Sequence, residues 1–240
     1  MAESLSGKTA IITGASSGVG WATALAFAAE GANVVATARR EERLRELCEL
    51  IAAKGGRAAY SAGDAAEEAT AIACVALARE KFGRLDILIN NAGAGNYKNL
   101  VDTSVEDYDA LMDTNMRSGF VFTRHAVPVM LEQGAGEVLF ISSVAGLQGS
   151  PGEAVYCASK FAQVGFAQAL DAELRKHGIK VGVLCPGGVK TEFAIGKGRT
   201  EEGVSSSHMM DPADVADAII FACTRPANAR IPQMIVRHMG

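Results

Sequence analysis

The chain has 240 residues, of which 49% are hydrophobic and 21% charged, and its formal net charge is −4 at pH 7. This length and apolar content suffice for one large α/β domain with a sizeable core. The negative net charge disfavours nucleic acid and anionic membranes as partners, and no apolar run approaches the about 20 residues that span a bilayer.

Short apolar segments alternate with longer amphipathic ones along the whole chain. The short segments are rich in Val, Ile and Leu, as in strands buried on both faces of a parallel sheet. In chain order, the predicted strands are Lys8–Thr13, Asn33–Thr37, Arg57–Ser61, Asp86–Asn90, Glu137–Ser142, Lys180–Leu184 and Gln233–Val236. The predicted helices between them are Val19–Glu30, Glu41–Lys54, Ala66–Phe82, Val105–Leu131, Tyr156–Lys176 and Pro212–Cys223. This alternation predicts an α/β Rossmann fold, a doubly wound sheet of seven parallel strands with helices on both faces.

One segment fits neither pattern. Residues 192–210 contain three glycines and the serine run Ser205–Ser207, without strand or helix periodicity. We interpret this segment as a mobile substrate flap near the carboxyl edge of the sheet. Because no linker or repeat interrupts the chain elsewhere, we expect residues 1–240 to form a single dinucleotide-binding domain.

A glycine-rich turn joins the first predicted strand to the first predicted helix. Such a turn lets the backbone approach a pyrophosphate, and the helix N-terminus supplies N–H donors and the positive end of the helix dipole. The alternative is a tight turn that needs glycine for its own geometry. The residues concerned are Gly14, Ser16, Ser17, Gly18, Val19 and Gly20, in the pattern TGxxxGxG. This pattern resembles the turn of the short-chain dehydrogenases/reductases, which implies that these residues bind a nicotinamide dinucleotide.

The end of the second predicted strand indicates which nicotinamide. An acid there binds the ribose hydroxyl of NAD, whereas an arginine accommodates the 2′-phosphate of NADP. Here Ala38 takes the acidic position, and Arg39 and Arg40 follow. We therefore predict NADP(H), although the arginines could instead be a solvated start of the next helix. Asp64, followed by Ala65, resembles the family acid that meets the adenine, and a helix N-cap is an equally good reading of it.

Tyr156 and Lys160 form a YxxxK pair on one face of a predicted helix. An ordinary tyrosine is a poor base at neutral pH, and an ammonium one turn away lowers its pKa. Ser143, 13 residues earlier, resembles the family serine that polarises a substrate carbonyl, with Ser142 as its rival. Asn115 resembles the family asparagine that links the lysine to solvent through a water.

Two further elements match the family pattern and extend the resemblance from Lys8 to the last strand. One follows the fourth predicted strand and the other follows the sixth, and both are expected to line the cofactor. They comprise Asn91, Ala92 and Gly93 of an NNAG element and Pro186, Gly187, Val189 and Thr191 of a PGxVxT element. The resemblance implies that the NNAG element supports the sheet and lines the cofactor, and that the PGxVxT loop, with Thr191, meets the nicotinamide carboxamide.

The resemblance implies transfer of a hydride between NADP(H) and a small-molecule ketone, aldehyde or secondary alcohol, with Tyr156 as general acid/base. It also implies that Tyr156 and Lys160 contact the cofactor, with Lys160 holding the nicotinamide ribose. Two alternatives remain open: a reductase of 3-ketoacyl thioesters, and a non-catalytic NADP(H)-binding sensor or scaffold. The histidines share no metal-ligand spacing, so no metal is expected. The five cysteines lack CxxC spacing, which is typical of reduced thiols in a cytoplasmic protein. The family is commonly oligomeric, so a homotetramer or dimer is expected.

Overall fold

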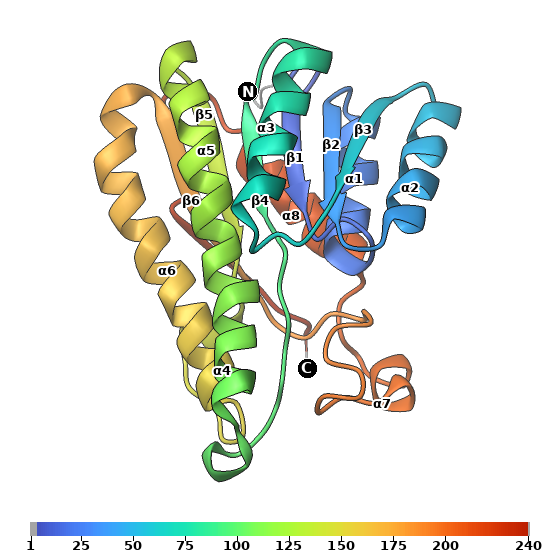
Figure 1. Cartoon of the computed structure of the whole chain (residues 1–240), viewed down its shortest axis with the longest axis vertical. Helices are drawn as coiled ribbons and strands as arrows, with labels where there is room; N and C mark the ends of the chain where they lie inside the picture. Colours follow the sequence, from blue (N-terminus) through green and yellow to red (C-terminus); the bar gives the residue numbers. More distant parts are fainter. Residues whose placement is uncertain (1–3, 240) are drawn as a thin grey trace.

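A parallel sheet of seven strands forms the centre of the protein (Figure 1), in the order β3-β2-β1-β4-β5-β6-β7. The computed structural model describes residues 4–239; residues 1–3 and 240 of the expected domain lie outside the described part. The strands are β1 (Thr9–Thr13), β2 (Asn33–Ala38), β3 (Arg57–Ala62), β4 (Ile87–Asn90), β5 (Gly136–Ile141), β6 (Ile179–Pro186) and β7 (Gln233–Val236). The α-helices are α1 (Gly18–Ala29), α2 (Glu41–Ala53), α3 (Glu68–Phe82), α4 (Val105–Met112), α5 (Ser118–Gln133), α6 (Ala154–Leu174), α7 (Glu201–Ser205) and α8 (Pro212–Cys223).

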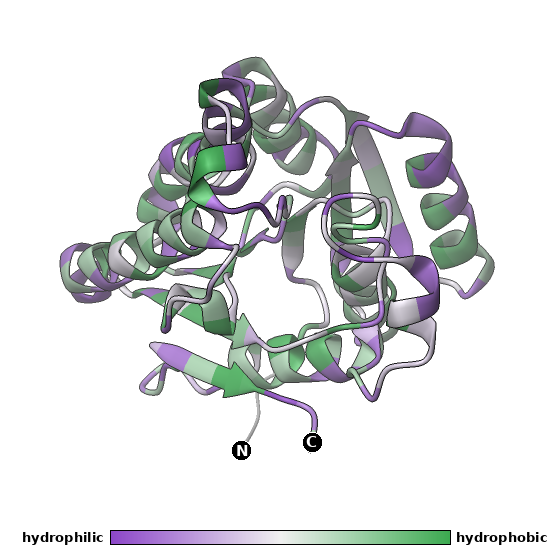
Figure 2. Cartoon of the chain, turned by 90° about the horizontal axis from the view of Figure 1, so that it is seen from below, coloured by the Kyte–Doolittle hydropathy of each residue, from purple (hydrophilic) through white to green (hydrophobic). Residues whose placement is uncertain are grey.

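Helices cover both faces of the sheet, which confirms the predicted doubly wound class. One face packs against α1, α2 and α8, through buried side chains such as Phe27 and Ile219. The other packs against α3, α5 and α6, with Phe122 at its core. The helix α2 at the outer edge places its hydrophobic residues inward and its charged residues outward, as the hydropathy colours show (Figure 2). No helix in residues 4–239 is long and apolar enough to cross a membrane.

The chain builds outward from β1 in one direction and from β4 in the other. In such sheets a crevice opens at the carboxyl ends of the strands, where the order reverses, and ligands bind there. The switch point between β1 and β4 is therefore where the fold itself places a site.

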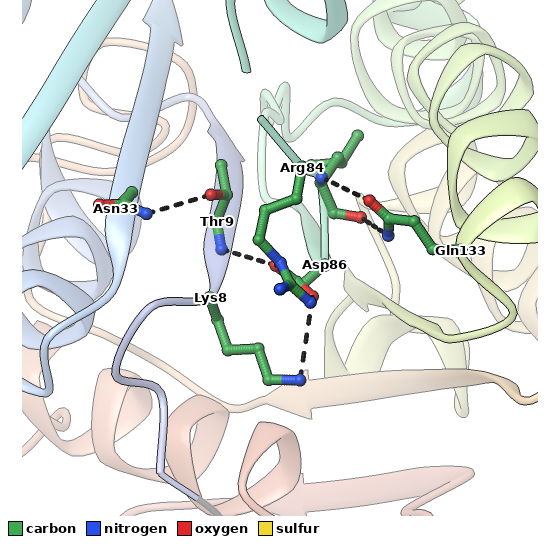
Figure 3. Close-up of polar contacts among 7 residues, drawn as sticks. Lys8, Thr9, Asn33, Arg84, Asp86 and Gln133 are labelled. Carbon is green, nitrogen blue, oxygen red and sulfur yellow. Dashed lines mark hydrogen bonds and ion pairs between the residues drawn. The ribbon is translucent and has the colours of Figure 1, made fainter. Parts of the chain in front are cut away.

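A polar network ties together the opposite, amino edge of the same two strands (Figure 3). The buried carboxylate of Asp86 accepts hydrogen bonds from the backbone N–H of Thr9 at 2.9 Å and from the Arg84 guanidinium at 2.7 Å, and Lys8 lies 3.8 Å away. Gln133 at the end of α5 pairs with the backbone of the residue between Arg84 and Asp86. These contacts fix the spacing of β1 and β4 at the edge of the sheet opposite the switch-point crevice.

Helix α8 has its predicted bounds, whereas α1, α2 and α6 differ from their predicted bounds by one or two residues at an end. Two further differences have a structural reason. The predicted helix Val105–Leu131 is α4 and α5 joined by a π-helical turn, Asp113–Arg117. Such a turn contains an extra residue, which hydrophobic periodicity does not reveal because the helix continues through it. Helix α3 begins at Glu68 and not at Ala66, because the Asp64 side chain accepts from the backbone N–H of Ala66 at 2.9 Å and holds the preceding residues in a turn.

Segment 192–210 lies at the carboxyl edge of the sheet and carries a short helix, α7, that the sequence did not predict (Figure 1). Thr200 caps α7 by accepting from the backbone N–H of Gly203 at 3.1 Å. Before α7, the chain folds back on itself where Ile195 pairs with Arg199. After α7, Met210 pairs with Val189 at the end of the flap. The flap is thus built from hydrogen-bonded turns.

Candidate active site

A cavity of about 810 Å³ opens at the switch point, beyond the carboxyl ends of the strands. Its walls are the glycine turn after β1, the residues after β2 and β3, the ends of β4, β5 and β6, and the flap. Its volume suits a cofactor-sized ligand. Every residue that the sequence predicted as a cofactor contact lines this cavity, apart from Gly20 in the layer behind.

The glycine turn needs glycine for close approach. Gly14 and Gly18 have positive φ angles of 67° and 56°. A Cβ on Gly20 would collide with the carbonyl oxygen of Gly14 and lie 2.5 Å from the side chain of Asn91, and one on Gly18 would lie 2.9 Å from Thr191. The turn is therefore packed directly against the loops after β4 and β6.

The residues after β4 hold this turn from behind. Asn91 Nδ2 donates to the backbone oxygen of Thr13 at 2.8 Å. In return, Thr13 Oγ1 accepts from the backbone N–H groups of Asn91 and Ala92 at 3.0 and 2.9 Å. The Asn91 amide thus explains why an asparagine follows β4: it donates to a backbone carbonyl at the start of the turn and joins the two loops.

The N-terminus of α1 faces the cavity without a side-chain acceptor. Its N-cap is Ser17, whose side chain makes no capping hydrogen bond, and its first turn holds no acidic residue. Free N–H donors and the positive end of the helix dipole therefore face the cavity, where an anion binds well.

The end of β2 brings two arginines to the same cavity. Ala38 is buried, and Arg39 and Arg40 are exposed residues of the cavity wall. Arg40 reaches the glycine turn, donating from Nε to Ser16 Oγ at 3.2 Å, and its Nη1 pairs with Glu192 of the flap at 2.8 Å. Across the cavity wall from them lie Asp64 and Ala65. Asp64 makes the turn-forming bond described above, and the N-cap of α3 is Glu67, so the reading of Asp64 as the helix N-cap is wrong.

Tyr156 lies in the first turns of α6, 5% exposed, with its ring against two other aromatic rings. The Tyr97 ring centre is 5.6 Å away and the Phe193 ring centre 5.9 Å. Burial raises the pKa of the Tyr156 phenol well above its usual value, Tyr97 raises it further, and a hydrogen bond with the Ser143 side chain lowers it. The phenol thus keeps its proton at neutral pH.

The two serines after β5 face different ways. Ser142 Oγ donates to the backbone oxygen of Lys160 at 3.0 Å, in the interior. Ser143 lies against Tyr156 and accepts from the backbone N–H of Ala145 at 3.2 Å. Neighbouring residues of an extended chain point to opposite sides, so only Ser143 meets the tyrosine.

Lys160 is 3% exposed and lies one turn after Tyr156, with its Nζ 5.9 Å from the Tyr156 ring centre. Its ammonium donates to the backbone oxygen of Ile141 and to Gln163 Oε1, both at 3.1 Å. Among residues 4–239 no carboxylate forms an ion pair with it. Burial therefore lowers the pKa of Lys160 to about 8.

Asn115 sits in the π-helical turn, fully buried. Its side chain bridges to the backbone of Ala94 at 2.7 and 3.0 Å and donates to Ser159 Oγ at 2.8 Å. The backbone carbonyl oxygen of Asn115 accepts from Gln163 Nε2 at 2.6 Å. Gln163 therefore lies between Lys160 and the Asn115 carbonyl, where the family resemblance implies a water.

Sequence reasoning missed Gln163 and Arg199. Gln163 is a buried amide on the hydrophobic face of α6, seven residues after Tyr156, and its polarity among apolar neighbours was the signal. Arg199 lies in the flap, and its guanidinium carbon is 5.7 Å from the ring centres of both Tyr97 and Phe193. No sequence pattern linked Arg199 to these rings, because the flap has no periodicity.

The loop after β6 closes the remaining wall with Pro186, Gly187, Val189 and Thr191. The Gly187 N–H donates to the backbone oxygen of Val236 in β7 at 2.8 Å, and Thr191 Oγ1 accepts from the N–H of Phe193 at 3.2 Å. The edge strand thus holds this loop beside the catalytic candidates. Within residues 4–239 no group of His, Cys, Asp and Glu is arranged to hold a metal ion.

Comparison with known proteins identifies the class. The sequence model described as short chain dehydrogenase matches residues 8–202, and the chain belongs to this family of oxidoreductases. An uncharacterized oxidoreductase of Thermotoga maritima is 43% identical over 186 residues, which cover 78% of this chain and 73% of the relative. An A-factor type gamma-butyrolactone 1'-reductase (1S-forming) of Streptomyces virginiae is 39% identical over 236 residues, covering 93% of this chain and 91% of the relative.

A solved structure shows the same architecture. The closed form of serine dehydrogenase complexed with NADP+ superposes with a TM-score of 0.89 and 30% sequence identity, covering 95% of this chain and 94% of the other. A metagenomic short-chain oxidoreductase in complex with NADP gives a TM-score of 0.85 at 31% identity, over 99% of this chain and all of that one.

Proposed function

We propose that this protein is an NADP(H)-dependent reductase or dehydrogenase of small-molecule carbonyls and alcohols. The observation that carries the proposal is the meeting of Tyr156, Ser143 and Lys160 in the same cavity as the glycine turn. The family membership supports the reaction class, and the relative that is a gamma-butyrolactone 1'-reductase supports a small-molecule substrate.

The cavity fits a nicotinamide dinucleotide. The uncapped N-terminus of α1 suits the pyrophosphate, and the two arginines after β2 suit a 2′-phosphate. Asp64 and Ala65 would lie by the adenine. Asn91, Ala92 and Gly93, with Pro186, Gly187, Val189 and Thr191, would line the nicotinamide half, and the NADP-bound neighbours support this choice of cofactor.

When bound, the reduced cofactor supplies a hydride to the carbonyl carbon. Tyr156 then gives its phenol proton to the carbonyl oxygen, so the C=O π pair becomes the new O–H bond and the tyrosine is left as tyrosinate. Ser143 orients the carbonyl and stabilises charge on its oxygen. Lys160 stabilises the tyrosinate, and water restores the phenol proton; in alcohol oxidation each transfer runs backwards. Asn115 anchors Lys160 through Gln163.

Turnover on a substrate panel tests this function. NADPH absorbance is followed with ketones, aldehydes and 3-ketoacyl thioesters. Oxidation of NADPH that depends on a small ketone or aldehyde supports the proposal. A preference for the thioesters would favour the alternative reductase. Silence on every compound, with tight NADPH binding by calorimetry, would favour a sensor or scaffold and refute the proposed function.

Removing the arginines after β2 should lower the preference for NADP. Arg39→Gln combined with Arg40→Gln is expected to raise KM for NADPH by roughly 10- to 100-fold, about 1.4–2.8 kcal/mol in total, because both arginines are exposed and each contact with the phosphate is screened by solvent. KM for NADH should barely change. Steady-state kinetics with both cofactors measures this, and Arg45→Gln, an exposed arginine on α2, serves as the control for loss of charge. Equal losses with NADH would refute the assignment.

The pH dependence should report Lys160. Because burial lowers its pKa to about 8, kcat/KM for carbonyl reduction should fall as pH rises through that value and the ammonium is lost. Gln163→Glu places a carboxylate beside Nζ, which favours the charged form and should move the fall to higher pH. Gln163→Met removes the acceptor and should move it to lower pH. Identical profiles for all three proteins would show that Gln163 has no influence on Lys160.

We also propose a homotetrameric or dimeric assembly. Phe120 on α5 and Phe161 on α6 are 43% and 46% exposed, and Ile235 of the edge strand β7 is 51% exposed. Burial of such side chains between copies would be favourable. Light scattering measures the mass, and Phe161→Asp should reduce it.

The five free cysteines support a reducing, cytoplasmic location.

A further inference from the structure

Arg199 is a positively charged residue of the cavity wall that takes no part in the proposed hydride and proton transfer. Arg199 is half-buried in the cavity wall, in the part of the flap before α7. Within residues 4–239 no carboxylate lies close enough to form an ion pair with its guanidinium, whereas Arg40 in the same wall is paired with Glu192. A half-buried arginine normally has a carboxylate or phosphate partner, because the guanidinium offers five N–H donors.

The flap holds Arg199 in a defined position. The N–H of Arg199 donates to the backbone oxygen of Ala194 at 3.0 Å, and the Arg199 oxygen accepts from Gly196 at 2.9 Å. Ala194 has a positive φ of 61°, unusual for a residue with a side chain, which marks this turn as constrained. The Tyr97 N–H donates to the oxygen of Lys197 at 3.0 Å and joins the turn to the segment after β4.

Close packing reinforces that position. Gly198 has a φ of 107°, and a Cβ on it would lie 2.5 Å from the Cβ of Tyr97. Tyr97 therefore rests directly on the turn, and the guanidinium of Arg199 faces its ring and that of Phe193. Arg199 also hydrogen-bonds the Tyr97 side chain. That bond uses part of its N–H edge, and because a guanidinium has five N–H donors, others remain for a planar acceptor.

The same two rings contact the ring of Tyr156. Arg199 thus contacts the same two rings as the catalytic candidate, and its positive charge acts on Tyr156 against the effect of burial, in the direction that lowers the phenol pKa. A substrate with its carbonyl at Tyr156 and Ser143 would extend along this wall towards the guanidinium.

We infer that Arg199 is a substrate-binding residue and that the substrate is a short oxo acid or hydroxy acid, whose carboxylate pairs with the guanidinium while its carbonyl or alcohol meets Tyr156. This inference rests on the proposed function. A carboxylate matches the planar fork of a single arginine in a bidentate pair. Glu153, an acid in the same wall, is half-buried and forms no ion pair with Arg199.

Paired substrates that differ only in charge test the inference. NADPH-dependent reduction of acetoacetate and levulinate is compared with that of their methyl esters, for the wild-type protein and for Arg199→Met and Arg199→Lys. Wild type should prefer the acids. Arg199→Met should lose roughly 10- to 100-fold in kcat/KM for the acids, mainly through KM, and little for the esters. Arg199→Lys, which keeps the charge and loses the fork, should fall between them.

The matched control is Arg57→Met. Arg57 also faces an aromatic ring, that of Phe82 at 5.2 Å, and it lies outside the cavity wall. Its loss removes the same charge and the same kind of contact, so the preference for acids should survive. A second readout is the binding of hydroxybutyrate and of its methyl ester to the NADP+-loaded protein, measured by calorimetry.

The outcomes separate the two proposals. If the wild type reduces esters as well as acids, or if Arg199→Met weakens both equally, Arg199 only packs against the rings; the inference is then overturned and the reductase function stands. If no carbonyl is reduced but hydroxybutyrate binds in an Arg199-dependent way, the anionic subsite stands and the proposed reaction falls. If hydroxybutyrate neither binds nor reacts, the subsite is refuted.

Discussion

Tyr156→Phe is expected to reduce kcat for carbonyl reduction by roughly 100- to 10,000-fold, the usual worth of a positioned general acid. The substitution removes one hydroxyl and keeps the ring that packs between Tyr97 and Phe193. The fold and the cofactor cavity should therefore be unaffected. Single-turnover measurement of NADPH oxidation gives the chemical rate, and calorimetry gives the affinity for NADPH, which should stay within about twofold.

Tyr108→Phe is the matched control, because Tyr108 is 45% exposed on α4 and loses the same atom outside the cavity. It should leave kcat unchanged. If Tyr156→Phe keeps near wild-type turnover while NADPH still binds, Tyr156 is not the proton donor and the mechanism fails at its central step. A parallel loss of NADPH binding would instead assign Tyr156 to the cofactor site.

The pKa values of Tyr156 and Lys160 are set in the structure by a different cause from the one that the sequence predicts. The spacing of Tyr156 and Lys160 predicts that the ammonium lowers the phenol pKa. In the structure, burial dominates both groups: it raises the pKa of Tyr156 and lowers that of Lys160 to about 8. A phenol that keeps its proton is in the form needed to protonate a carbonyl oxygen. One-dimensional spacing cannot reveal burial, which depends on the rings of Tyr97 and Phe193.

Most of the fold could be predicted because a doubly wound sheet leaves a strong periodic trace. The five inner strands are buried on both faces and read as apolar runs, and the helices between them carry apolar residues towards the sheet. The predicted segment Gln233–Val236 is strand β7 residue for residue, although it lies at an edge and is only partly buried. Boundaries moved where a side chain competed with the backbone, as Asp64 does at the start of α3.

The residues that escaped prediction share a physical reason. The π-helical turn around Asn115 adds one residue without changing the apolar face, so periodicity passes over it. Gln163 and Arg199 act through partners more than 40 residues away in sequence, Asn115 for one and Tyr97 for the other. Such pairings follow from how the elements pack, which a single sequence without relatives does not encode locally.

Gly20→Ala is expected to damage the cofactor site without touching any catalytic candidate. The new Cβ would collide with the backbone oxygen of Gly14 and press on the Asn91 amide, so the turn must open. Overpacking of this kind costs roughly 1–3 kcal/mol. The free protein can relax the turn, but binding of NADPH requires the tight form. The cost should therefore be divided between the free energy of unfolding and a Kd for NADPH raised by up to about 150-fold.

Gly165→Ala provides the opposite control for the same chemical change. Gly165 lies mid-helix in α6, one turn after Phe161, with open space around its Cβ position in the single chain. Alanine there should raise the stability of the helix by roughly 0.5–1 kcal/mol and leave NADPH binding unchanged, and light scattering checks that the variant keeps the mass of the wild type. Thermal unfolding with and without NADPH measures both terms for each variant. Gly20→Ala could instead match the wild type in both thermal unfolding and NADPH binding. That result would mean that the turn accommodates a Cβ at position 20 in spite of its packing against Gly14 and Asn91. The close approach of the two loops would then not be what positions the N-terminus of α1 for an anion.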